Sequence, residues 1–285
     1  MSGGDAMLAA AAAKGTLLTI NHNRRWENSM RKLQAAVKAG TLGTLHSAEV
    51  VWPSGRAGVV GTHFIDAMLM VVQQRAISVS GMIDDSPFVD CRNNADNADF
   101  MAIQGETNIH DPGCYGTIKM DGGLIVTVCA GNNLSGGAAI RLYGSAGQAE
   151  IGRGVITVKL FGKVSSVGQI VGEPSTEVSP LPTILPRTPT RAASSLTAPL
   201  LHAVHPRGVA QVWEEEGSDG LNTCERCVRE IVATLDGTAP FPYDPREGVH
   251  ACEILLGVMA SHKKNGAFVS IPMGPEDYEV AARWA

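Results

Sequence analysis

The first apolar segment of the chain has the pattern of a buried strand. Residues 16–22 read Thr-Leu-Leu-Thr-Ile-Asn-His and follow an Ala-rich, helix-sized segment that Gly15 ends. A strand with no polar alternation is typical of a parallel sheet that is covered on both faces. No segment upstream is long enough to supply partner strands. We therefore expect this sheet to be completed by another chain, or by a domain that the chain lacks.

Two stretches of helical periodicity follow, with a strand between them. The first has an apolar stripe that ends at Gly40, and residues 44–52 then have the pattern of a strand. Thr62 is an expected N-cap for the second helix. The stripe positions are Trp26, Met30, Leu33 and Val37 in the first helix and Ile65, Met68, Leu69 and Val72 in the second.

From about residue 77 to residue 161 the pattern changes to short β-rich runs that turn residues interrupt. Asp121-Gly122-Gly123 separates one pair of runs, 114–120 and 124–130. Residues 144–147 (Gly-Ser-Ala-Gly) separate another. Both are hairpin signals, and successive hairpins build an antiparallel sheet. We predict an α/β (α+β) fold with a large, mainly antiparallel open sheet that helices cover on one face.

The last third of the chain combines an irregular stretch with two helices. Residues 172–206 are rich in proline and have little apolar periodicity, so we expect a long irregular excursion. Helices are predicted near 221–235 and 245–263, closed by Gly237 and Gly266, and a last strand is predicted at 267–271.

Composition excludes some classes of function. The formal net charge of −5 over 285 residues offers no attraction to nucleic acid or to an anionic membrane. No window reaches the roughly 20 apolar residues of a membrane span. The Ala-rich run near the start lacks the basic residues of an export signal, and six cysteines then fit a reducing cytoplasm.

The sharpest local motif is Gly61-Thr62-His63-Phe64-Ile65-Asp66. In the first turn of a helix, the positive end of the dipole disfavours an imidazolium, so His63 would be neutral there. A neutral imidazole can take the proton of a substrate hydroxyl as a general base. Asp66 lies one turn further on the same face and could orient it. The alternative is structural: His63 binds backbone groups while Asp66 favours the dipole.

A second polar cluster, Asn21, His22, Asn23, Arg24 and Arg25, follows the predicted strand. Ligands of α/β proteins collect beyond the carboxyl ends of strands, where two arginines could hold hydroxyls or a carboxylate. The arginines could equally pair with carboxylates across an interface.

Cys224 and Cys227 invite a zinc or redox interpretation, with His202 and His205 as further ligands. However, both cysteines fall on one apolar helical stripe with Val228, Ile231 and Leu235, which favours core residues. We therefore expect no metal. The sequence also contains no Gly-x-Gly-x-x-Gly turn and no Walker loop.

Taken together, these motifs resemble the Gfo/Idh/MocA oxidoreductases, the family of glucose–fructose oxidoreductase and inositol dehydrogenase. The resemblance covers nearly the whole chain apart from 165–220. The stretches that carry it are 6–18 with Asn21 to Trp26, 33–45 with Gly40-Thr-Leu-Gly43, the His63 motif, Tyr143-Gly-Ser-Ala-Gly147, and 227–272 with Asp236-Gly-Thr-Ala-Pro-Phe241.

The resemblance implies a sugar or cyclitol dehydrogenase that uses NAD or NADP. Residues 1–22 would be a remnant helix and strand of the Rossmann domain. Residues 23–285 would form the substrate and oligomerisation domain, a homodimer or tetramer through the open sheet. His63 would take the proton of the substrate hydroxyl, and Asn21, His22, Arg24, Arg25 and Asp66 would lie at the substrate crevice.

The chain departs from the family pattern in three ways. It lacks the Rossmann strands with their glycine fingerprint, and it lacks the Glu-Lys-Pro motif with its catalytic lysine. Val59 stands where family members frequently carry an aspartate, four residues before the histidine. Catalytic groups act as a unit, so we expect this chain alone to be inactive. The alternative is a non-catalytic sugar-binding or dimerisation module derived from the family.

Overall fold

The computed structural model describes residues 3–53, 55–86, 111–134, 136–152, 155–160, 204–205, 208–213 and 221–282. Most of the proline-rich excursion predicted at 172–206, including His202, lies outside these residues. The helices are α1 (Gly3–Lys14), the 3-10 helix η1 (Asn23–Trp26), α2 (Asn28–Lys38), the π-helical turn η2 (Ala57–Gly61), α3 (Thr62–Val72), α5 (Thr223–Leu235), α6 (Pro245–Lys263) and α7 (Pro275–Ala282).

A ten-stranded sheet forms the centre of the molecule. Its order is β10-β2-β3-β4-β1-β5-β6-β7-β9-β8, and every neighbouring pair is antiparallel except β1 with β4. The strands are β1 (Leu45–Val51), β2 (Ala76–Asp84), β3 (Gly113–Met120), β4 (Ile125–Ala130), β5 (Ala139–Gly144), β6 (Gly147–Gly152), β7 (Val155–Leu160), β8 (Val204–His205), β9 (Gly208–Trp213) and β10 (Val269–Ser270).

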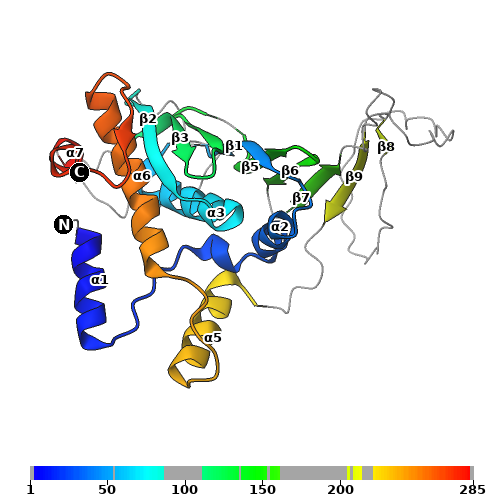
Figure 1. The fold of residues 1–285 in the computed structure, drawn as a ribbon, viewed down its shortest axis with the longest axis horizontal. Coiled ribbons are helices and arrows are strands. Elements are labelled where there is room, and N and C mark those ends of the chain that lie inside the picture. The colour runs from blue at the N-terminus through cyan, green and yellow to red at the C-terminus, as the bar shows by residue number, and fades with distance from the viewer. Residues whose placement is uncertain are drawn as a thin grey trace, which may run out of the picture.

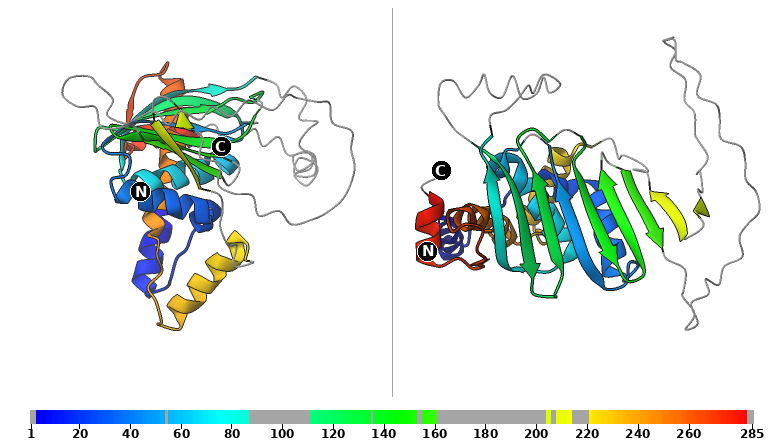
Figure 2. Two further views of the ribbon diagram at one scale, coloured as in Figure 1. Left: turned by 90° about the vertical axis from the view of Figure 1, so that its right-hand side faces the viewer. Right: turned by 90° about the horizontal axis from the view of Figure 1, so that it is seen from above.

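The described helices lie on one side of this sheet and leave its other face open (Figures 1 and 2). Burial alternates along the central strands, as in β4, where Val126, Val128 and Ala130 are buried and Ile125 and Thr127 are exposed. One face is therefore apolar and covered, as the hairpin pattern predicted. The two predicted hairpins are present as β3–β4 and β5–β6.

Helix α3 is the central helix of the covered face. All residues from Phe64 to Val72 are buried, because α2 and α6 both pack beside it over the sheet. Helix α6 is also tied to the sheet by Ser261, whose hydroxyl accepts the N–H of Gly81 at 2.9 Å and donates to the carbonyl of Ala267 at 2.7 Å. These contacts hold the first turn of α3 at a fixed place.

Two predictions about the helical side are wrong. Residues 16–22 are not a strand, and Leu17 is 37% exposed. A strand needs a neighbour for its backbone groups, and no described segment pairs with this one. Helix α5 does not bury its stripe: Cys224 is exposed, and Val228 and Leu235 are 56% and 70% exposed. In the described part of the chain α5 packs mainly on η1, so only Cys227 and Arg226 are buried.

The ends of the helices agree more closely with the sequence predictions. Gly15, Gly40, Gly237 and Gly266 all have positive φ at the ends predicted for their helices. Helix α3 begins at Thr62, but its N-cap is Gly61, which follows the π-helical turn η2. Helix α7 and the strands β8 and β9 were not predicted.

Candidate active site

The candidate site is built where η1 meets the first turn of α3. The ring of His22 lies edge-on to the ring of His63, with centroids 5.0 Å apart. A ring contact of this kind fixes the orientation of both imidazoles. The two motifs singled out in the sequence, 21–25 and 61–66, are therefore brought together.

His63 is half-buried at the start of α3. Its Nδ1 is buried and has no hydrogen-bond partner among the described residues. Burial lowers the pKa of His63 below its usual 6.5, and the nearby charges of His22 and Arg24 lower it further. Asp66 opposes these effects but does not reverse them. The imidazole is therefore neutral near pH 7 and able to accept a proton.

Asp66 is fully buried and is held by the cluster at residues 22–25. Arg25 donates Nε and Nη2 to its two carboxylate oxygens at 2.5 and 2.6 Å. The Nδ1 of His22 lies 3.3 Å from Oδ1. Burial would raise the pKa of Asp66, but His22 and Arg25 together hold it below its usual value. Asp66 is thus a fixed anion in contact with His22 and near enough to His63 to act on its pKa.

Arg25 is a structural residue of the site. Its side chain is 3% exposed, and besides Asp66 it contacts Glu247, with Nη1 2.6 Å from Oε2. Its guanidinium lies 4.6 Å from the centre of the Tyr243 ring, and Tyr243 donates its hydroxyl to the Arg25 carbonyl. Both partners from residues 243–247 were missed, because nothing in their local sequence links them to η1.

Arg24 occupies different surroundings. Its guanidinium lies 3.8 Å from the centre of the Phe64 ring, which in turn stacks on Trp52. It also donates to Glu27 at 3.1 Å. Arg24 and Phe64 line a cleft of 560 Å³ that extends from α2 to the start of α5. Asn21 is exposed.

The aspartate that the family frequently carries before its histidine has no equivalent at Val59, which is 42% exposed. The carboxylate of Asp111 instead accepts the N–H groups of Gly58 and Val59 at 2.7 and 2.8 Å. Asp111 was not singled out in the sequence, because it lies 52 residues from Val59. It caps the turn that leads into α3.

The described residues do not fit a dinucleotide. Only one of their strand pairs is parallel, residues 16–22 have no strand partner, and no glycine-rich turn joins a strand to a helix there. They also contain no group of three or more potential metal ligands. The five cysteines that the structure describes are free. No described helix is sufficiently long and apolar to cross a membrane.

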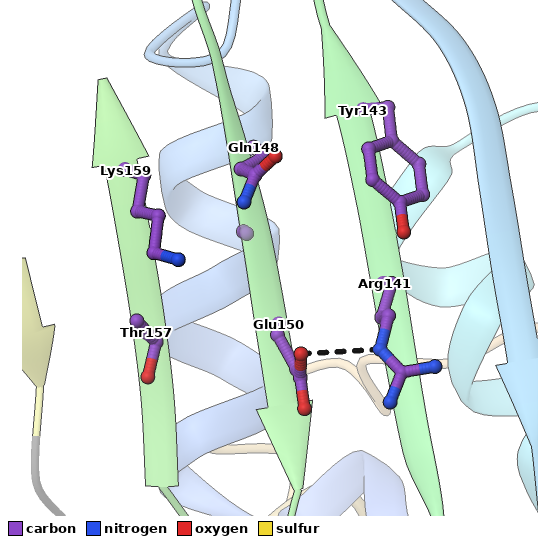
Figure 3. A pocket seen from close by; sticks show the side chains of 7 residues that line it. Arg141, Tyr143, Gln148, Glu150, Thr157 and Lys159 are labelled. Atoms are coloured by element: carbon purple, nitrogen blue, oxygen red, sulfur yellow. Dashed lines mark hydrogen bonds and ion pairs between the residues drawn. The ribbon is translucent and has the colours of Figure 1, made fainter. Parts of the chain in front are cut away.

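A further hollow of 280 Å³ lies on the open face of the sheet, over β5, β6 and β7 (Figure 3). Arg141 there donates to Glu150 at 3.1 Å and to Glu49 at 3.0 Å. Tyr143, Gln148, Thr157 and Lys159 complete its polar lining. This surface is on the side of the sheet opposite His63 and is charged with both signs.

Solved structures of other proteins share this architecture. An inositol dehydrogenase homolog from Azotobacter vinelandii, solved with NADH and myo-inositol, has a TM-score of 0.61 at 14% identity, with 94% of this chain and 68% of that protein covered. The chain has the Gfo/Idh/MocA oxidoreductase fold. No family model and no curated protein sequence matches it.

Two other solved structures show the range of proteins with this fold. The WlbA dehydrogenase from Bordetella pertussis, in complex with NADH and UDP-GlcNAcA, has a TM-score of 0.57 at 12% identity, with 95% and 69% of the two chains covered. A super-repressor mutant of Gal80p from Saccharomyces cerevisiae has a TM-score of 0.62 at 10% identity, with 98% and 69% covered. At such identities the likeness concerns the fold.

Proposed function

We propose that this chain is the substrate domain of an NAD(P)-dependent oxidoreductase that acts on a hydroxyl of a sugar or cyclitol. The observation that carries the proposal is His63: a neutral imidazole whose buried Nδ1 has no partner in the described chain, in ring contact with His22, which in turn lies beside the Asp66–Arg25 pair. A buried polar atom without a partner is the exception in native proteins, and a substrate hydroxyl would give this nitrogen one.

In this proposal His63 takes the proton of the substrate hydroxyl. Asp66 and Arg25 hold the histidine pair in place, while Asn21, His22 and Arg24 border the substrate. NAD or NADP would accept the hydride, and it would be held outside the described residues. We propose two parts for the chain: a remnant of a nucleotide domain at 1–22 and the substrate domain at 23–285. We also propose that the protein works in a reducing cytoplasm.

Two measurements test this function. The chain titrated with NADH or NADPH should give no fluorescence or calorimetric response by itself. When it is fused to the Rossmann half of an enzyme with this fold, it should oxidise a polyol such as myo-inositol. Turnover should be abolished by His63→Ala and retained by Arg141→Met, a change on the opposite face. A fusion that is equally active with and without His63 contradicts the proposal.

A non-catalytic binding module is the second candidate. Val59 favours it, because an expected acidic group is missing beside His63, and so does the likeness to Gal80p, a protein described as a repressor. In that case the fusion would bind polyol without turnover, and His63→Ala would leave binding unchanged.

A second copy of the chain is the proposed partner of the open sheet face. Its exposed apolar side chains are Met82 (61%), Tyr115 (45%), Ile125 (37%) and Tyr143 (38%). The same face carries charges of both signs at Glu49, Arg141 and Glu150. Such a mixed surface can be complementary to itself in a two-fold dimer.

A further inference from the structure

The cleft beside Arg24 has features that the proposed proton transfer does not use. Its volume of 560 Å³ is in the range of small-molecule sites. Its walls come from the start of α2, from Phe64 of α3, from β5 and β6, and from the residues that open α5. His63 does not line the cleft, but Arg24 at its wall lies near enough for its charge to lower the pKa of His63.

The N-terminus of α2 lies at this cleft through Ser29 and Met30. The first intrahelical bond of α2 is donated by Arg31, and the preceding amides have no acceptor within the helix. Glu27, at the N-cap, makes no side-chain capping bond. The helix dipole therefore presents its positive end, with amides that the helix itself does not pair, to a group bound in the cleft.

Ser29 gives an independent indication of a ligand. It is 2% exposed, it lines the cleft, and its hydroxyl has no hydrogen-bond partner within the described part of the chain. Leaving a buried hydroxyl unpaired costs free energy, so the position is explained if a bound group supplies the partner.

The charged side chains of the cleft favour an anion. Arg24 and Arg226 both line it, and Arg226 extends Nη1 to the carbonyl of Trp26 at 2.9 Å, which fixes its direction. Glu27 offsets part of this charge through its pair with Arg24. The lining thus brings two guanidinium groups and one carboxylate next to the helix N-terminus.

We propose that this cleft binds the anionic group, carboxylate or phosphate, of a substrate whose hydroxyl reacts at His63. The helix amides and the Ser29 hydroxyl donate hydrogen bonds to its oxygens, and Arg24 supplies charge. The substrate class is thereby narrowed from polyols in general to acidic sugars and sugar phosphates. The part that concerns reaction at His63 rests on the proposed function, whereas the anion site stands on the cleft itself.

Calorimetric titration of the full chain tests the site with three probes: D-gluconate, D-glucose 6-phosphate and neutral D-glucose. At least one anion should bind about tenfold more tightly than glucose, because hydrogen bonds to charged groups are the stronger ones. The tighter of the two anions identifies the recognised group as carboxylate or phosphate.

Two variants and one control make the test specific. Ser29→Ala and Arg24→Met should each weaken anion binding by about tenfold and leave glucose affinity unchanged. Arg141→Met removes an arginine from the opposite sheet face and should leave the affinities for the anions and for glucose unchanged. Thermal melts of each variant verify that it is folded. The Ser29 hydroxyl makes no hydrogen bond to another described residue that its replacement would break, so this variant remains informative if Arg24→Met misfolds.

The proposal is overturned if no probe binds, if glucose binds as tightly as the anions, or if Arg141→Met weakens binding as much as Arg24→Met does. His63→Gln separates this site from the proposed function. Anion binding that survives in this variant, together with a fusion that is inactive even with His63 intact, contradicts the dehydrogenase and leaves the anion site in place. An active fusion without anion preference contradicts only the anion site.

Discussion

At the scale of residues, the structure gives two adjacent arginines different roles. Arg25 is enclosed by Asp66, Glu247 and Tyr243, whereas Arg24 lies on Phe64 at the wall of a cleft. The sequence presents them as one basic pair. Arg25 anchors η1 to α3, and Arg24 is the one available to a ligand.

Asp66→Asn should lower the free energy of unfolding by about 3 kcal/mol, because it leaves a buried guanidinium with an incomplete partner. Urea denaturation measures the change. Glu49→Gln is the matched control, since it removes an exposed partner of Arg141 and should cost about 1 kcal/mol or less. Equal effects in the two variants would show that the Asp66–Arg25 pair is not a structural anchor.

The pKa of His63, followed by NMR, should lie below 6.5 and should rise in Arg24→Met, because a neighbouring positive charge is removed. Methionine can still cover the Phe64 ring. Arg141→Met, which removes a partner of Glu49 on the opposite face of the sheet, should leave the His63 titration unchanged. An unshifted titration in Arg24→Met would rule out this charge coupling.

The same pKa makes stability depend on pH. His63 binds its proton less tightly in the folded chain than in the unfolded one, so the unfolded state takes up more protons below pH 6.5. The free energy of unfolding should therefore fall as pH decreases from 7 through 6.5 toward the lowered pKa. His63→Gln should flatten this slope, as measured by denaturation at a series of pH values; an unchanged slope would contradict a lowered pKa.

At the scale of elements, the position of the site depends on how helices are joined to the sheet. Helix α3 is apolar beyond Asp66, so apolar packing positions most of its length. Its place is set by α2 and α6, and α6 is fixed to β2 by the bonds of Ser261.

Ser261→Ala should lower the free energy of unfolding by about 1–3 kcal/mol, because the buried N–H of Gly81 loses its acceptor. Thr238→Ala removes an exposed hydroxyl that bonds to Ala233, where water can replace it, and should change stability by about 0.5 kcal/mol or less. The denaturant midpoints of the two variants measure this difference in stability. A Ser261 variant as stable as the Thr238 variant would show that this bond does not fix α6.

At the scale of the whole molecule, three surfaces lack cover in the described chain: the open sheet face, the outer face of α5 and the surface of α1. Helix α1 has no buried residue although it consists largely of alanine, leucine and methionine. In Figure 2 both α1 and α5 extend away from the sheet on its helical side. This is the side on which the proposed nucleotide domain would dock.

The proposed dimer predicts a concentration-dependent mass. Met82→Glu should convert the dimer to a monomer in analytical ultracentrifugation, because it introduces like charges from both copies into an exposed apolar surface. Leu235→Glu on α5 is the control, since it changes an exposed apolar residue on the helical side and should leave the dimer intact. If both variants and the parent chain are monomers, the open face is not an interface between copies.

Hydrophobic periodicity by itself determined the order and approximate limits of α2, α3, α5 and α6, both hairpins, and the open antiparallel sheet, because these features depend on residues close in sequence. It failed at residues 16–22 and on the outer face of α5, where burial requires partners that no described segment supplies. The pairing of His22 with His63, the enclosure of Arg25 by Glu247, and the cleft at Ser29 were decided by tertiary structure. Each joins side chains from elements far apart along the chain, and only the packing of α3 between α2, α6 and the sheet brings them together.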